Sequence, residues 1–91
     1  MANPPAPAPA QLIDELEHII VERHLKGVPP EGFDRHYPLL DHGVLDSLGM
    51  INLIGYLEQR YAVVFEDHEI LPGHFASIQA LGDLLAGKLK E

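Results

Sequence analysis

The hydrophobic residues of the chain recur at helical spacing in three segments, residues 10–27, 47–61 and 77–89. Apolar positions three or four residues apart indicate an amphipathic helix that buries one face. These positions are Leu12, Leu16, Ile19 and Ile20; then Leu48, Met50, Ile51, Leu53, Ile54, Leu57 and Tyr61; and finally Ile78, Leu81, Leu84, Leu85 and Leu89. The pattern predicts three main helices. Because no two strand-like segments are present to pair, it predicts an all-α fold.

The second segment is expected to be the central helix, because its apolar positions nearly surround it. Gly55 lies in its middle and costs about 1 kcal/mol relative to alanine. Such a glycine indicates the close approach of another element or of a ligand, or else it is simply tolerated. The sequence leaves both interpretations open.

Proline and glycine mark the connections between the helices. Gly27 predicts the end of the first helix, and residues 28–46, with three prolines and two glycines, predict a long loop. The apolar loop residues expected to contact the core are Val28, Phe33, Tyr37, Leu39, Leu40, Val44 and Leu45. A short helix is expected from Asp67 to Leu71 and should end at Pro72, and Ser77 is expected to cap the last helix.

The predicted architecture is a small antiparallel bundle of three main helices plus one short helix, with a long loop between the first and second helices. Residues 1–10 are rich in proline and alanine, which favours an extended, disordered tail. Residues 11–91 then form one helical-bundle domain, a length that suits a single small core.

Charge and composition narrow the classes of function. Six Lys and Arg residues against 14 Asp and Glu residues give a formal net charge of −8. This balance disfavours nucleic acid and anionic membrane surfaces as partners, and no apolar run approaches the roughly 20 residues that a membrane span needs. The absence of a secretory signal pattern and of cysteine fits a reducing compartment. We expect a cytoplasmic monomer.

Neither a metal centre nor an active site is expected. His18 and His24 are six residues apart, which does not bring two rings to one helix face, and the other four histidines fall in predicted loops. Ser47 has no evident histidine and aspartate partners for nucleophilic catalysis. We therefore expect a protein that is not an enzyme.

Ser47 has two interpretations. In the simpler one, Asp46 or Ser47 accepts a hydrogen bond from the first free N–H groups of the second helix and only caps it. In the other, the hydroxyl is a chemical handle at the positive end of that helix, where a phosphate ester would be stabilised.

The segment Asp46-Ser47-Leu48, with Gly43 upstream, resembles the motif that begins the second helix of the acyl carrier protein (phosphopantetheine-binding carrier protein) family. The resemblance continues through Leu53, Leu57, Glu58, Tyr61 and Phe65 and through residues 75–85. It covers roughly residues 10–89, all of the chain except the tail and the last two residues.

This resemblance implies a carrier rather than a catalyst. A phosphopantetheinyl transferase would attach 4'-phosphopantetheine from coenzyme A to Ser47, and a substrate would ride on the thiol of that arm as a thioester. Asp46, Leu48, Met50 and Ile51 are the residues expected near the arm or the docking surface. The implied partners also include an acyl- or aminoacyl-loading ligase and downstream acyl-transfer enzymes.

One departure from the family pattern bears on the cargo. Many fatty-acid carriers have several acidic residues along this helix, whereas here Glu58 is its only carboxylate. This difference disfavours docking to the general enzymes of fatty-acid synthesis. The segment Leu45-Asp46-Ser47-Leu48-Gly49 also resembles that of stand-alone aminoacyl carriers, including the D-alanyl carriers, which a dedicated adenylating ligase loads. An alternative of a different class is a non-catalytic helical interaction module in which Ser47 is only a helix cap.

Overall fold

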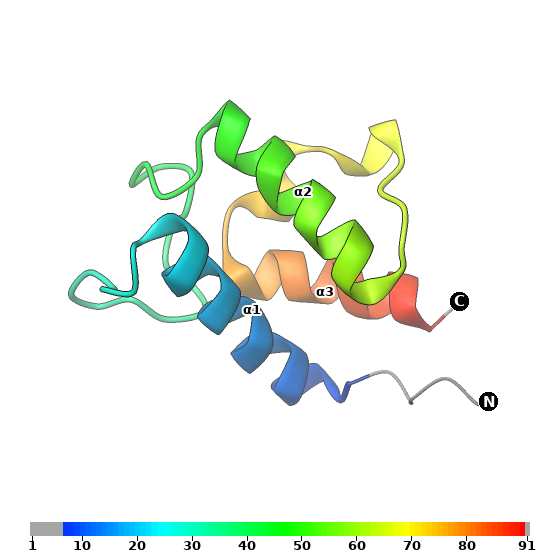
Figure 1. The fold of residues 1–91 in the computed structure, drawn as a ribbon, viewed down its shortest axis with the longest axis horizontal. Helices are drawn as coiled ribbons and strands as arrows, with labels where there is room; N and C mark the ends of the chain where they lie inside the picture. Colours follow the sequence, from blue (N-terminus) through cyan, green and yellow to red (C-terminus); the bar gives the residue numbers. More distant parts are fainter. Residues whose placement is uncertain (1–6, 91) are drawn as a thin grey trace.

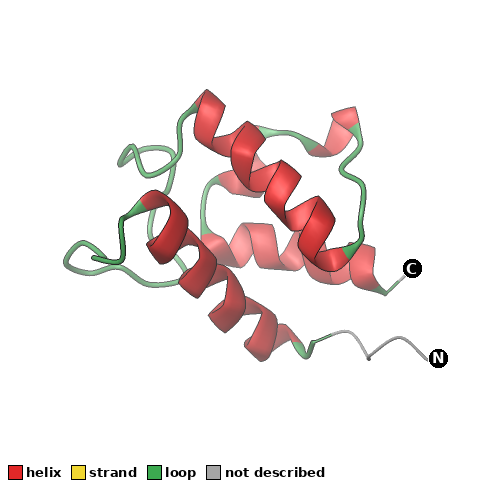
Figure 2. Ribbon diagram, viewed as in Figure 1, coloured by secondary structure: helices red, strands yellow, loops and turns green. Residues whose placement is uncertain are grey.

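The computed structural model describes residues 7–90, which form three α-helices and two short 3-10 helices (Figure 1). Their bounds are α1 Pro9–His24, α2 Ser47–Tyr61, η1 Asp67–Glu69, η2 Pro72–Phe75 and α3 Ile78–Leu89. The described residues contain no strand (Figure 2). Helices α1 and α2 run in opposite directions, and α3 lies behind them in this view (Figure 1). The predicted all-α bundle of three main helices is confirmed.

The core consists of buried apolar side chains from the three helices, the long loop and the segment after α2. They are Leu12, Ile13, Leu16, Ile19, Ile20, Leu39, Leu45, Leu53, Ile54, Leu57, Phe65, Phe75, Ile78, Leu81 and Leu85. Burial of each large apolar side chain stabilises the fold by about 1.5–3 kcal/mol, more than a typical hydrogen bond of about 1 kcal/mol. Apolar packing therefore decides which helix faces turn inward.

Helix α1 begins earlier than the sequence predicted. Pro9 is its first residue, so residues 9 and 10, assigned above to the tail, belong to the helix. Proline suits this position because the first helical N–H has no intrahelical partner to lose. Residues 1–6 lie outside the described residues. The helix ends at His24, and the chain turns away at Gly27, whose φ of 81° favours glycine.

Helices α1 and α3 meet at a glycine that the sequence analysis did not single out. Gly82 is buried, and a Cβ built on it would lie 2.5 Å from Cδ1 of Ile13. The missing side chain therefore allows the two helices to approach closely. At Gly55, by contrast, no packing partner lies within 4 Å of a built Cβ. The suggestion that Gly55 permits close approach of another element is wrong.

The long loop is held to the body of the protein mainly by Leu39 and Leu45, which are both buried. The backbone N–H of Leu39 donates to the carbonyl of Ala76 at 2.8 Å, and the N–H of Gln79, in the first turn of α3, donates to the carbonyl of Arg35 at 2.8 Å. The prediction that Val28 contacts the core is wrong, because its side chain is 73% exposed.

Helix α2 is less central than its sequence suggests. It buries Leu53, Ile54 and Leu57, whereas Leu48 and Ile51 are 66% and 65% exposed. Leu48 and Ile51, although part of the apolar pattern, therefore lie outside the core. These two residues occupy the opposite side of the helix from the buried set, so the first turns of α2 present apolar side chains to solvent.

The connection from α2 to α3 contains two 3-10 helices where one short helix was predicted. The first ends at Glu69, and Pro72 begins the second instead of ending the first. Proline is favourable at this position because its fixed φ suits the first residue of a helix. Nζ of Lys88 lies 2.6 Å from Oε1 of Glu69, an ion pair that ties η1 to α3.

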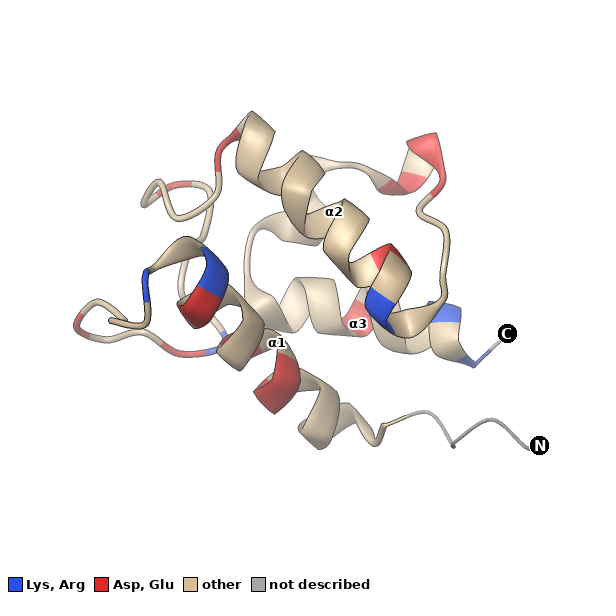
Figure 3. Cartoon of the chain, in the orientation of Figure 1, with Lys and Arg blue, Asp and Glu red and all other residues tan. Residues whose placement is uncertain are grey.

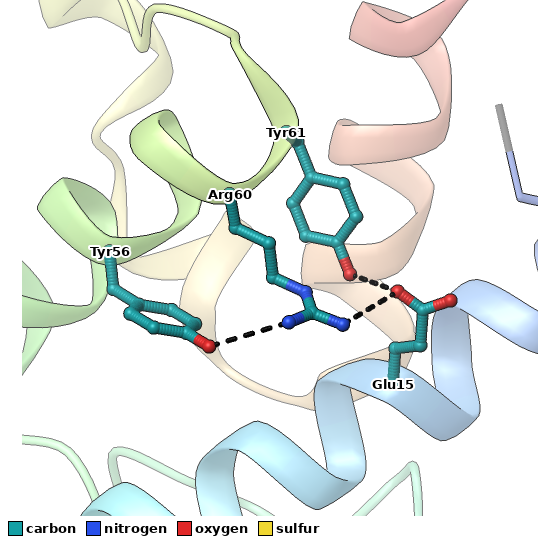
Figure 4. Close-up of polar contacts among 4 residues, drawn as sticks. All are labelled: Glu15, Tyr56, Arg60 and Tyr61. Carbon is teal, nitrogen blue, oxygen red and sulfur yellow. Dashed lines mark hydrogen bonds and ion pairs between the residues drawn. The ribbon is translucent and has the colours of Figure 1, made fainter. Parts of the chain in front are cut away.

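A polar cluster joins α1 to the last turns of α2 (Figure 4). The Tyr61 hydroxyl donates to Oε1 of Glu15 at 2.7 Å, and Nη2 of Arg60 lies 3.4 Å from the same oxygen. Burial, reinforced by the hydrogen bond to Glu15, raises the pKa of Tyr61 to about 12. The phenol therefore remains a protonated donor at neutral pH.

Candidate functional site at the start of α2

The side chain that caps α2 is Asp46. Its Oδ1 accepts a hydrogen bond from the backbone N–H of Gly49 at 2.7 Å, and its backbone is extended, as is usual before a helix. Ser47 is the first residue of the helix and is exposed. Of the two capping residues considered from the sequence, Asp46 is confirmed, and the interpretation of Ser47 as the cap is wrong.

The loop before α2 fixes where Ser47 emerges. Gly43 has a φ of 74°, a conformation that favours glycine, and its N–H donates to the carbonyl of Leu40 at 3.2 Å. Two residues later, Leu45 is buried, with a relative exposure of 2%, and its N–H donates to the carbonyl of Leu39. With Leu45 anchored in the core, Asp46 and Ser47 follow directly at the surface.

Ser47 is also the serine that remains free for chemistry. The chain has two serines and no threonine. Oγ of Ser77 accepts a hydrogen bond from the N–H of Ala80 at 3.1 Å, which confirms its predicted role as the cap of α3. Oγ of Ser47 has no hydrogen-bond partner among residues 7–90.

The backbone at this end of α2 favours an anion. The N–H groups of Ser47 and Leu48 have no acceptor within the described part of the chain. Such free donors, together with the helix dipole, stabilise negative charge near a helix N-terminus. An ester of phosphate on Ser47 Oγ would therefore fit the donors that are present.

His24, at the end of α1, packs beside the first turn of α2 and was missed as a site residue. A Cβ on Gly49 would lie 3.1 Å from Oδ1 of Asp46 and 3.7 Å from Nδ1 of His24, so this glycine leaves room for both. Nε2 of His24 is buried without a hydrogen-bond partner in the described region. Burial and then Arg23 lower the pKa of His24, and Asp46 opposes the shift.

The residues expected near an arm or a docking surface divide into two groups. Asp46, Leu48 and Ile51 are exposed around Ser47, whereas Met50 is half-buried and packs against the core. No charged residue lies between Ser47 and Leu57 on α2, as Figure 3 shows. Oε2 of Glu58, the only carboxylate of the helix, accepts a hydrogen bond from the N–H of Phe65 at 2.9 Å. Apart from the capping residue Asp46, the surface that α2 presents beside Ser47 is thus uncharged.

Neither a metal site nor a membrane-spanning helix is found among residues 7–90. No group of three or more His, Cys, Asp or Glu side chains there is arranged to hold a metal ion. No helix in that range is long and apolar enough to cross a membrane.

Comparison with known proteins decides the family. Residues 21–85 match the family model described as "Phosphopantetheine attachment site". The chain belongs to the phosphopantetheine-binding carrier protein family. The carrier protein is also similar to the solved "Structure of KstB-PCP(apo)", with 32% identity, a TM-score of 0.73 and 88% of each chain covered.

A second solved structure, titled "Crystal structure of FAD-dependent dehydrogenase", contains a chain that is 37% identical. The match has a TM-score of 0.69 and covers 77% of the carrier protein and 97% of the other chain. No curated protein sequence matches. The two structural matches confirm the fold.

The family membership establishes the general activity. The carrier protein carries an acyl or peptidyl group on a covalently attached 4'-phosphopantetheine arm. Members of the family interact with phosphopantetheinyl transferases and with biosynthetic enzymes, and their carrier domains are generally non-catalytic.

Proposed function

We propose that Ser47 is the residue that carries the 4'-phosphopantetheine arm. The observation that carries this proposal is that Ser47 is exposed at the first position of α2 while Asp46 performs the capping. The hydroxyl is therefore free to form an ester, and the unpaired N–H groups beside it favour the phosphate. When bound, the arm supplies a thiol for thioester formation, which the chain, having no cysteine, does not itself contain.

The chain's own residues would present this ester to other proteins. The buried anchor Leu45 and the cap Asp46 fix the start of α2, so a transferase meets Ser47 in one orientation. Leu48 and Ile51, both about two-thirds exposed, form an apolar platform next to it. We propose that partner enzymes dock on this platform through apolar contacts, with little contribution from charge on α2. Met50 supports the platform from the core side.

Intact-mass measurement tests the attachment residue. After incubation with coenzyme A and a broad-specificity phosphopantetheinyl transferase, the wild-type chain should gain the mass of one arm, and Ser47→Ala should gain nothing. Ser77→Asn is the matched control, because asparagine can replace the capping oxygen of the only other serine. It should gain the full mass. Gain of mass by Ser47→Ala would refute the proposal.

We further propose that the cargo is an aminoacyl group loaded by a dedicated adenylating ligase. The uncharged first turns of α2 support this narrower function, because they lack the carboxylates that fatty-acid carriers of the family present there. Loading of the modified protein by candidate ligases, followed by intact mass, tests it. Loading with fatty acyl groups alone would contradict it.

The remaining expectations also stand as proposals. We propose that the protein is a non-catalytic monomer that works in the cytoplasm, where transferase, loading ligase and acyl-transfer enzymes would meet it in turn. Light scattering of the modified protein at several concentrations tests the oligomeric state, and a mass that rises with concentration would contradict it.

A further inference from the structure

A shallow trough of about 430 Å³ lies along the exposed side of α2 beyond Ser47. It is lined by Arg23, Ile51, Asn52, Gly55, Tyr56 and Gln59. Helix α1 supplies Arg23 and α2 supplies the rest. The trough lies outside the hydrophobic core, because four of its lining residues are exposed: Ile51, Asn52, Gly55 and Gln59.

The trough follows from helix geometry and one missing side chain. Residues four apart form ridges along a helix, and a groove lies between neighbouring ridges. Ser47, Ile51, Gly55 and Gln59 form one ridge, which is interrupted at Gly55, where no packing partner lies within 4 Å of a built Cβ. The guanidinium of Arg23 lies 4.1 Å above the ring of Tyr56 and closes the far wall.

We propose that the 4'-phosphopantetheine arm on Ser47 rests in this trough, with its thiol end near Gly55 and the Arg23–Tyr56 pair. This inference rests on the proposed attachment to Ser47. Gly55 is eight residues from Ser47, which is about 12 Å along the helix axis at about 1.5 Å per residue. The arm has the backbone length of four to five extended residues, roughly 15 Å at about 3.4 Å each. Its reach therefore matches the trough.

The chemistry of the lining also matches the arm, which carries two methyl groups near the phosphate and two amides further along. Ile51, 65% exposed and one helical turn beyond Ser47, provides an apolar contact for the methyl groups. The side-chain amides of Asn52 and Gln59 have no hydrogen-bond partner among residues 7–90. Each can donate to and accept from an amide of the arm.

Nuclear magnetic resonance of the modified, isotope-labelled protein tests the placement without any enzyme assay. Nuclear Overhauser contacts are expected between the arm methyl groups and the Ile51 side chain, and between the arm and the side-chain amide of Asn52. Gly55→Leu should abolish the contacts beyond Ile51, because leucine fills the gap in the ridge. This variant should fold, since the position is open and leucine favours helix.

Gly87→Leu is the matched control, because Gly87 is an exposed glycine in α3 and is equally open. It should leave every contact of the arm unchanged. The inference is overturned if an attached arm shows no contacts beyond the first turn of α2, or if Gly55→Leu leaves them intact. Intact mass is recorded for each variant, and failure of attachment itself would refute the role of Ser47.

Discussion

Asp46 and Ser47 are neighbours with different roles: Asp46 caps α2, and Ser47 is the proposed attachment residue. Substitutions at the two positions should therefore have different effects. Asp46→Ala removes the acceptor for the Gly49 N–H, and loss of an N-cap costs about 1 kcal/mol, within a range of roughly 0.5–2. It also removes a negative charge from the positive end of α2, worth about 0.3–1 kcal/mol more. The variant should therefore lose about 1–2 kcal/mol of unfolding free energy.

Ser47→Ala should behave in the opposite way. Its hydroxyl has no hydrogen-bond partner in residues 7–90, and alanine is favourable in a helix, so the unfolding free energy should change by less than about 0.5 kcal/mol. Attachment of the arm should nevertheless be lost completely. Asp46→Asn is the control for charge, because asparagine caps a helix about as well as aspartate.

Thermal unfolding followed by far-UV circular dichroism, paired with intact mass after transferase treatment, measures both properties. At about 4–8 °C per kcal/mol for a domain of this size, Asp46→Ala should lower Tm by roughly 4–16 °C. Ser47→Ala should leave Tm nearly unchanged. If Ser47→Ala lowers Tm as much as Asp46→Ala does, the hydroxyl is a structural cap and the reasoning fails.

Two further predictions concern the packing of α1. Gly82→Ala would place a Cβ 2.5 Å from Cδ1 of Ile13, so this methyl group must shift within the core and part of the helix-propensity gain of about 1 kcal/mol should be lost. Gly87→Ala, in open space, should show that gain in full. Urea unfolding measures both, and equal stabilisation would contradict the close contact. Because the pKa of His24 is lowered in the folded state, the unfolded state binds more protons below about pH 6.5, and stability should fall as the pH decreases. His24→Gln should reduce this loss of unfolding free energy at low pH, whereas the control His18→Gln, on the exposed face of α1, should not. Identical profiles of unfolding free energy against pH for the wild type and both variants would contradict the burial of Nε2 of His24.

The helices and the position of the site could be predicted from sequence because both depend on local patterns. Apolar periodicity marked all three helices, and the Asp-Ser-Leu segment marked the start of α2. Periodicity alone could not show that Leu48 and Ile51 are exposed, since an apolar residue beside a docking surface has the same pattern as one in a core.

Contacts between distant segments were the part that the sequence did not reveal. Gly82 and Gly55 look alike as helical glycines, and only the crossing of α1 over α3 makes Gly82 the tight one. His24 was considered only as a metal ligand, because nothing in its local sequence indicates that it packs beside Gly49 and Asp46. The capping choice between Asp46 and Ser47 likewise depended on the backbone geometry of the turn before α2.

The pinned loop before α2 has a consequence for how the protein matures. Leu45 is buried and Asp46 caps α2 through contacts within the chain itself, so we expect attachment of the arm to leave the start of the helix unchanged. A partner enzyme should thus meet the same arrangement of α2 before and after the arm is attached.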